Sequence, residues 1–359
     1  MPRYHQAMHT RLDQSVPAGL RDRLSIAPEV ADAIAAGRPV VALESTLISH
    51  GLPFPQSVEV ARAAEMAVRE SGAVPATVAI QGGRILVGLS EEQLVTLTTT
   101  IGVMKASRPS LSVAIAGGGW AATTVSATMI AASAAGIGVF ATGGIGGVHR
   151  GALGVPGHAA RPTLDISSDL EELARTAVAV VCAGPKAILD VPATLEYLET
   201  RGVPVVAVGT SQMPGFWTRD SGIPAPASVA DVAAAAELVA THFALGLGSS
   251  VLLCVPVPEA DAYPPADTRA AVEMAIAGAA AAGIEGPAVT PWLLARMAEI
   301  TEGRSVRANV ALIVNNARFA GQLAVALART WAPVTTSGEA WPAEQSWIDR
   351  GLREDRRHD

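Results

Sequence analysis

Lysine is rare in this chain, and its two occurrences are the residues best suited to covalent chemistry. The sequence has 26 basic residues, of which only Lys105 and Lys186 are lysines. Arginine keeps its proton and is a poor nucleophile, whereas a desolvated lysine amine can attack a carbonyl and form a Schiff base. Lys186 follows an apolar segment, residues 178–182, and an Ala-Gly-Pro turn, at the expected start of a helix. Loops at strand ends carry chemistry in α/β folds, so this position favours a functional lysine over a surface charge.

Apolar segments alternate with amphipathic segments along most of the chain, which is typical of an α/β protein. Short runs of Val, Ile, Leu and Ala predict strands at residues 39–43, 75–80, 84–87, 111–115, 138–141, 178–182, 203–208 and 250–255. Helices are predicted at residues 26–37, 57–70, 90–97, 123–135, 168–176, 192–200, 229–245, 267–282, 290–301 and 306–330. One of them begins with a capping box, Ser90 followed by Gln93. The alternation predicts a largely parallel central sheet with helices on both faces, a three-layer α/β/α fold.

Composition excludes several classes of protein. The formal net charge is -7 and the pI is near 5.6, whereas a surface that binds nucleic acid would be basic. The polar N-terminal residues lack the apolar stretch of a signal peptide, and the most apolar runs are interrupted by Thr, Ser and Gly, so no membrane association is expected. Cys182 and Cys254 lie in apolar runs without metal-ligand spacing, and reduced core cysteines fit the cytoplasm.

Nine motifs in fixed order resemble the pseudouridine-5'-phosphate glycosidases, also called the indigoidine synthase A-like family. The most specific are TGGIGGVHRG within residues 139–151 and VCAG-x-K within residues 180–190. The others are VALEST and ISHGLPFPQ within residues 41–56, QGGRILVGLS at 81–90, ATTVSATM at 122–129, DISSDL at 165–170, TPWLLARMAEIT at 290–301 and NVALIVNNA at 309–317. The resemblance covers roughly residues 26–327, so we expect one catalytic domain at residues 26–330. Residues 1–25 are expected to be a flexible leader and residues 331–359 a flexible tail.

The resemblance implies a reaction, a metal and an assembly. The reaction is reversible cleavage of the C–C glycosidic bond of pseudouridine 5'-phosphate to uracil and D-ribose 5-phosphate, through a lysine Schiff base. A C-glycoside lacks a good leaving group, so covalent catalysis by an amine is a reasonable route. The family implies a divalent cation, Mn²⁺ or another such as Mg²⁺, and a homotrimer.

Matching the motifs residue by residue assigns the roles. Lys186 matches the nucleophile and Glu44 the proton donor, although Glu44 beside Ser45 could instead cap a helix. Asp165 matches the metal ligand, since oxygen ligands suit a hard cation. The residues that match substrate-binding positions are Lys105, Val125, Thr142, His149, Ser167, Ser168, Asp169 and Asn309. Two alternatives stay open: residues 167–169 could be a helix N-cap with a first-turn acid, and His149 an ordinary loop histidine.

Departures from the family pattern keep further alternatives open. The loop at residues 151–164 is longer than usual, and its His158 could be a stray residue or an added ligand. A related enzyme acting on another nucleotide or sugar phosphate would differ in the loops at residues 211–226 and 256–265. A sugar kinase fits the alternation but lacks an ATP-binding motif. A non-catalytic metabolite-binding protein is disfavoured by the set of Glu44, Lys105, Asp165 and Lys186.

Overall fold

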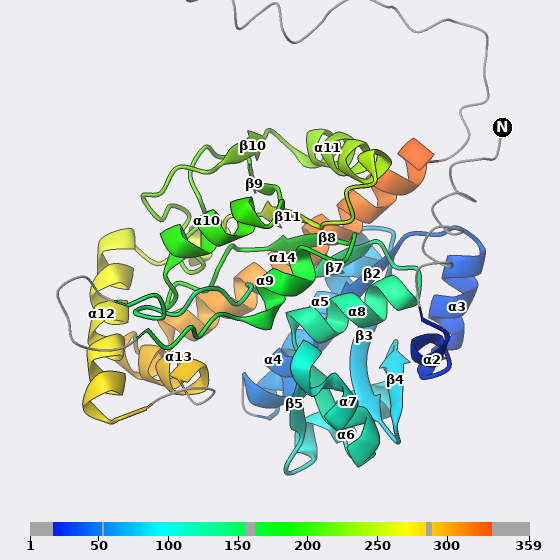
Figure 1. Cartoon of the computed structure of the whole chain (residues 1–359), viewed down its shortest axis with the longest axis horizontal. Helices are drawn as coiled ribbons and strands as arrows, with labels where there is room; N and C mark the ends of the chain where they lie inside the picture. The colour runs from blue at the N-terminus through cyan, green and yellow to red at the C-terminus, as the bar shows by residue number, and fades with distance from the viewer. Residues whose placement is uncertain (1–16, 52–53, 155–161, 285–288, 332–359) are drawn as a thin grey trace, which may run out of the picture.

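A computed structural model describes residues 17–51, 54–154, 162–284 and 289–331 as an α/β fold around one sheet (Figure 1). In the described residues this sheet has eleven strands, in the order β1-β4-β3-β2-β7-β8-β11-β9-β10, with β6 paired to β3 and β5 paired to β6. The prediction of a largely parallel sheet covered by helices on both faces is confirmed.

The centre of the sheet is parallel and buried on both faces. Its strands are β2 (Val40–Leu43), β7 (Val139–Ala141), β8 (Ala179–Cys182), β11 (Val251–Cys254) and β9 (Val205–Val208), followed by β10 (Ala227–Val229) at the edge. Alternate side chains enter opposite cores, as Val180 and Val181 do. Both faces require apolar side chains, which explains why these strands read as continuous apolar runs.

The other half of the sheet contains the antiparallel pairs. The long strand β3 (Val74–Gln81) runs antiparallel to β4 (Arg84–Val87) and to β6 (Ala121–Thr123), and β5 (Met104–Ala106) lies parallel to β6. Strand β1 (Leu24–Ile26) pairs with β4. The end of the expected leader therefore belongs to the sheet, while residues 1–16 lie outside the described part.

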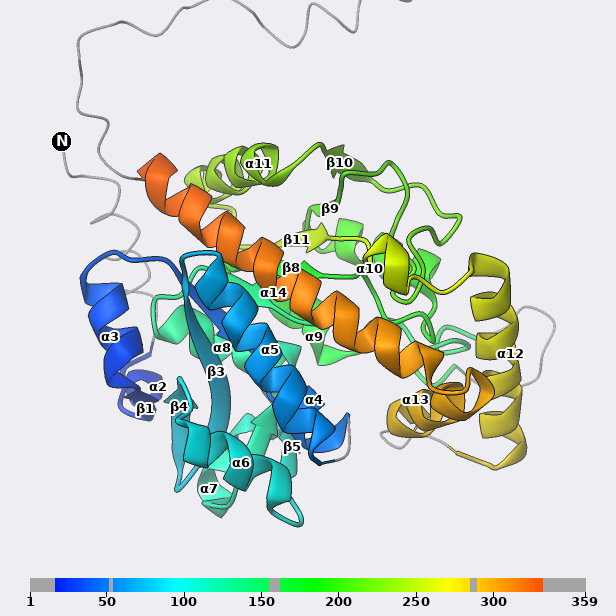
Figure 2. The same cartoon turned by 180° about the vertical axis from the view of Figure 1, so that it is seen from behind.

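Helices cover the two faces in separate groups, as Figures 1 and 2 show from opposite sides. One face carries α3 (Pro28–Ala35), α8 (Val125–Ala134), α9 (Ser168–Leu173) and α10 (Val191–Thr200). The other carries α5 (Gln56–Glu70), α11 (Val232–Leu245) and α14 (Arg304–Trp331), with α12 (Pro265–Ala281) and α13 (Val289–Ile300) beyond the sheet end. The remaining helices are α2 (Ala18–Arg21), α4 (Thr46–His50), α6 (Glu91–Thr99), α7 (Leu111–Gly117), η1 (Arg108–Ser110) and η2 (Glu259–Asp261).

Helix α14 crosses the centre of this sheet face over β2, β7 and β8, and it packs against α5 and α11 (Figure 2). Among the described residues, Arg304–Arg329 is the one helix long and apolar enough to span a membrane, by length and composition alone. Half of that stretch is buried, and Leu312, Ala320 and Leu323 lie in the main core. These contacts are typical of a core helix.

Two predicted elements are wrong. Residues 111–115 form helix α7, not a strand, because the preceding turn η1 has Pro109 as its second residue and a capping box between Ser107 and Ser110, and α7 continues from it. The apolar run at residues 111–115 is too short to show a helical or a strand period, so the strand prediction failed. Val113 is 60% exposed, which does not fit a buried strand. No helix starts after Pro185 either, since α10 begins at Val191 with Asp190 as its N-cap. The capping box of α6 is confirmed, with Gln93 N donating to Ser90 Oγ at 3.2 Å.

Candidate active site

Three neighbouring parallel strands bring the principal candidates together. Glu44 directly follows β2, Thr142 directly follows β7, and Lys186 lies in the turn after β8. Strands β2, β7 and β8 are adjacent in the sheet, so their carboxyl ends meet at one edge. Open α/β sheets bind ligands at this edge. A cavity of about 130 Å³ lies there, and its lining includes Glu44, Lys105, Thr142, Lys186 and Asn309.

Glu44 is held by Thr142 in surroundings that favour its neutral form. The Thr142 hydroxyl donates to Glu44 Oε1, and Thr142 is only 4% exposed. Burial raises the pKa of Glu44, and the positive charge of Lys186 and the hydrogen bond from Thr142 offset this only in part. In the described residues, Glu44 does not cap the following helix α4. A carboxyl group with a raised pKa is suited to donate a proton.

The turn after β8 presents the Lys186 amine without a competing partner. Pro185 forms an isolated β-bridge with Ile145, and Lys186 N donates to Ile145 O at 3.1 Å. These contacts join the turn to the glycine-rich run after β7, residues 142–147. Gly184 has φ +89°, and an added Cβ would lie 3.0 Å from Pro214 O. The Lys186 side chain is half-buried and makes no hydrogen bond or ion pair with the described residues. Its amine is therefore available to a substrate.

Lys105 brings a second cation to the same cavity. It lies on β5, in the antiparallel half of the sheet, and its side chain reaches the cavity lining. Partial burial lowers the pKa of Lys105, the charge of Lys186 lowers it further, and Glu44 and Asp169 oppose this. Two ammonium groups and one acid around a small cavity suit an anionic substrate.

The predicted segment 167–169 caps a helix and braces the glycine-rich run. Ser167 Oγ accepts from Asp169 N at 3.2 Å as the N-cap of α9, and Ser168 Oγ lies 3.3 Å from Ser126 Oγ. Asp169 is 6% exposed, and its two carboxylate oxygens accept from Gly146 N at 2.9 Å and Ser126 N at 3.0 Å. Neither this segment nor Val125, buried at the start of α8, lines the 130 Å³ cavity. Their substrate-binding role stays a prediction.

His149, which follows the glycine-rich run at residues 142–147, lies beside Asp165. His149 N donates to Asp165 O at 3.0 Å, and His149 Nδ1 lies 3.8 Å from Asp165 Oδ2. Burial lowers the pKa of His149, the negative charge of Asp165 opposes this, and the charges of Lys186 and Lys105 add to the lowering. His149 thus lies beside Asp165 and does not line the 130 Å³ cavity, and its substrate-binding role stays a prediction.

The Asp165 donor set fits only a largely hydrated cation. In the described parts of the chain, no three His, Cys, Asp or Glu side chains gather as a metal cluster. Asp165 is 41% exposed and offers one carboxylate, which suits Mg²⁺ or Mn²⁺ that keeps most of its water ligands. His158, a possible added ligand, lies outside the described residues.

Asn316 is a site residue that the sequence reasoning missed. Its Nδ2 donates to Thr142 O at 2.9 Å and Gly143 O at 3.3 Å, and its Oδ1 is buried without a partner in the described structure. Asn316 thereby fixes from α14 the backbone that carries Thr142. It follows Asn309 by seven residues, two helical turns on the same face, and this spacing of two amides in an apolar helix was the available signal.

Comparisons with known proteins agree with this geometry. Residues 29–326 match the family model described as indigoidine synthase A like protein. The chain is 56% identical over 317 residues to a pseudouridine-5'-phosphate glycosidase of Methylobacterium nodulans, covering 88% of this chain and 92% of the relative. It is 52% identical over 304 residues to one of Caldanaerobacter subterraneus, covering 85% and 96%. The crystal structure of a prealnumycin C-glycosynthase in complex with ribulose 5-phosphate superposes with a TM-score of 0.78 at 41% identity, covering 86% and 98%.

Proposed function

The chain belongs to the indigoidine synthase A-like family, and on that premise we propose that it reversibly cleaves the C–C glycosidic bond of pseudouridine 5'-phosphate to uracil and D-ribose 5-phosphate. The observation that carries the proposal is the convergence of Glu44, Lys105 and Lys186 on one cavity at the sheet edge. The names of the relatives support the reaction, and the ribulose 5-phosphate of the structural neighbour supports a sugar phosphate as substrate.

The proposed mechanism begins with ring opening. The Lys186 amine attacks C1' of the ribose, the C1'–O4' bond breaks, and protonated Glu44 gives its proton to O4'. The Glu44 carboxylate then takes a proton from the positively charged lysine nitrogen, which leaves a neutral secondary amine at C1'. The hydrogen bond from Thr142 fixes the position of the Glu44 carboxyl group, and its raised pKa suits both proton transfers.

Carbon–carbon cleavage follows from the open-chain adduct. The nitrogen lone pair forms C=N at C1', the C1'–C5 bond to uracil breaks, and Glu44 returns its proton to C5. Water then hydrolyses the protonated imine, which frees ribose 5-phosphate and restores the lysine amine, and the released proton returns to the Glu44 carboxylate. Lys105 contributes a compact positive charge for the anionic substrate.

We propose that a divalent cation, Mn²⁺ or Mg²⁺, is held by Asp165 mainly through water. Bound there, it would supply positive charge to an anionic group of the substrate. An Asp165→Asn variant should need a higher Mn²⁺ concentration for half-maximal activity, with an unchanged melting temperature because Asp165 is partly exposed. An unchanged metal requirement would remove Asp165 from this role.

Borohydride trapping tests the covalent step directly. Wild type incubated with ribose 5-phosphate and Mn²⁺ should yield a pentose-phosphate adduct on the peptide that contains Lys186, as read by mass spectrometry. The Lys186→Ala variant should yield none, and Lys105→Ala should still be labelled on Lys186. Condensation of uracil with ribose 5-phosphate without any adduct would contradict the imine mechanism.

A second candidate substrate keeps the chemistry and changes the base. The structural neighbour is named a C-glycosynthase, and Phe216, from the loop at residues 211–226, lines the cavity here. Condensation assays with ribose 5-phosphate should show uracil used in preference to other aromatic carbon nucleophiles. Turnover without ATP would separate both candidates from a sugar kinase, and a Lys186→Ala variant without any defect would favour a binding protein.

We also propose the homotrimer, from the family resemblance, and the cytoplasmic location, from the reduced core cysteines. Sedimentation velocity should give a particle of three times the 36.6 kDa chain mass. A monomer at assay concentration would contradict the trimer. Fractionation of the producing cells should place the enzyme activity in the cytoplasm.

A further inference from the structure

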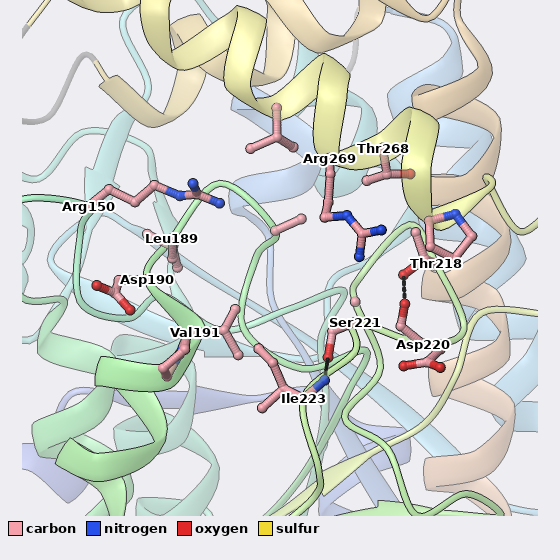
Figure 3. Close-up of a pocket in the computed structure, with 15 residues that line it drawn as sticks. Arg150, Leu189, Asp190, Val191, Thr218, Asp220, Ser221, Ile223, Thr268 and Arg269 are labelled. Carbon is pink, nitrogen blue, oxygen red and sulfur yellow. Dashed lines mark hydrogen bonds between the residues drawn. The ribbon is translucent and has the colours of Figure 1, made fainter.

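A second and larger cavity lies beside the lysine turn, outside the site described above. Its volume is about 470 Å³, within the usual range for small-molecule sites. Its walls are the turn from Ala187 to Pro192, the loop from Gly215 to Ile223, and the first turns of α12, with Arg150 at one side (Figure 3). None of the predicted catalytic, substrate-binding or metal-binding residues lines it. The two cavities share this turn, since Lys186 lines the active cavity and the next residue, Ala187, lines this one.

Two arginines face this cavity from different walls. Arg150 extends from the loop after the glycine-rich run, and Arg269 extends from α12 toward Ser221 (Figure 3). Arg269 makes no hydrogen bond or ion pair with the described residues. Arg150 pairs with Glu273 at 2.6 Å, but both side chains are exposed and such pairs are weak. Two guanidinium groups with weak or no internal partners are suited to a phosphate group.

The remaining polar groups suit hydroxyls. Asp190 Oδ1 accepts from Ala193 N at 3.0 Å and Asp220 Oδ1 accepts from Gly222 N at 2.6 Å, which leaves each carboxylate a second oxygen. Thr268, which also lines the cavity, has a buried hydroxyl without a partner in the described structure, so rotating it toward a ligand would break no bond. A bare anion would meet both carboxylates, whereas a polyol phosphate would give them hydroxyl donors.

We propose that this cavity is a second ligand site for a small phosphorylated polyol, with its phosphate between Arg150 and Arg269 and its hydroxyls on Asp190 and Asp220. The wall from Ala187 to Asp190 belongs to the turn that carries Lys186, so the bound ligand would contact the segment that positions the nucleophile.

Calorimetric titration with ribitol 5-phosphate tests the site, because this probe has no carbonyl and cannot form an imine. Wild type should bind at two sites per chain, and Arg269→Met should weaken one of them by about tenfold or more. Lys105→Met should weaken the other, which reports the active cavity separately. Arg296→Met is the matched control, since Arg296 is an exposed arginine that pairs with Glu299 on α13.

The outcomes are distinguishable from failure of the proposed enzyme function. Equal binding by Arg269→Met and Arg296→Met would overturn the second site, whatever Lys105→Met does. Inorganic phosphate binding as tightly as ribitol 5-phosphate would overturn the polyol assignment. If Arg269→Met weakens the binding of ribitol 5-phosphate and Lys105→Met and Arg296→Met do not, the second site is supported even though the active cavity then binds no sugar phosphate.

Discussion

At the scale of single residues, Glu44 shows a conflict between stability and function. Its carboxyl group is placed where burial raises its pKa, so ionising it in the folded protein is unfavourable. An acid that resists ionisation is what proton donation to O4' needs. The same property implies a cost to folding at pH values where the unfolded chain carries the charge.

Replacing Glu44 by Gln should therefore abolish turnover and stabilise the protein. Below the unfolded pKa, near 4.5, both side chains are neutral and the melting temperatures should agree. As pH rises toward the raised folded pKa, wild type loses stability that Glu44→Gln retains, by about 2 °C or more. Thermal denaturation from pH 4 to 8 measures the difference. Glu59→Gln, at an exposed position on α5, should show none, and a less stable Glu44→Gln at pH 8 would contradict the argument.

Thr142 sets the acidity of Glu44 through its hydroxyl. Thr142→Val keeps the shape and removes the hydrogen bond that lowers the Glu44 pKa. The alkaline limb of kcat/KM, where Glu44 ionises, should move to higher pH, and the plateau should fall because a weaker acid donates less readily. Thr142→Ser should leave the limb in place. An unmoved limb in Thr142→Val would show that this limb does not report Glu44.

At the scale of elements, the glycine-rich run after β7 fits closely against the start of α9. A Cβ on Gly146 would lie 2.3 Å from Ser167 Oγ and 2.9 Å from Asp169 Oδ2, so only glycine allows this approach. This close approach allows the Gly146 N–H to donate its hydrogen bond to Asp169 Oδ2.

Gly146→Ala should consequently destabilise the protein by about 2 kcal/mol or more, through overpacking and the loss of a buried hydrogen bond. Chemical denaturation measures the change in the free energy of unfolding. Gly117→Ala is the matched control, because a Cβ there meets nothing within 4 Å. Similar stability of the two variants would contradict this account of the contact.

The elements also show what the sequence could predict. Central strands such as β8 were predictable because burial on both faces leaves only apolar residues, and α6 because its capping box is local. Helix α7 was not, since its short apolar run has no period and its start depends on the turn before it. Matching the family motifs singled out Glu44, Lys105 and Lys186, and all three line the 130 Å³ cavity. The contact of Asn316 with Thr142 joins residues 174 positions apart, so the amide spacing on α14 could indicate Asn316 but not its partner.

At the scale of the whole molecule, α14 completes both the core and the active cavity. Its buried residues include Leu323 and Leu327 near its end, while Asn309 lines the cavity near its start. The described fold ends with this helix at Trp331. Stability should therefore depend on the last turns of α14 and not on the residues beyond it.

Truncation tests this division. A chain ending at Trp331 should keep the melting temperature and activity of the full protein, because we expected a flexible tail at residues 331–359 and only its first residue, Trp331, belongs to α14. A chain ending at Gln322 loses the buried Leu323 and Leu327, and should lose several kcal/mol of stability. Circular dichroism melts compare the two. A strongly destabilised Trp331 truncation would show that the following residues contribute to the fold.

The position of α14 in the chain also determines when the protein becomes complete during synthesis. The segments that carry Glu44, Thr142 and Lys186 all leave the ribosome before residues 304–331 do. The contacts of α14 with α5 join segments more than 200 residues apart, and such long-range contacts form late because closing a long loop costs entropy. Until α14 docks, the part of this sheet face that α14 covers beside α5 and α11 is exposed. We expect the nascent chain to be inactive and prone to aggregation until this last helix docks.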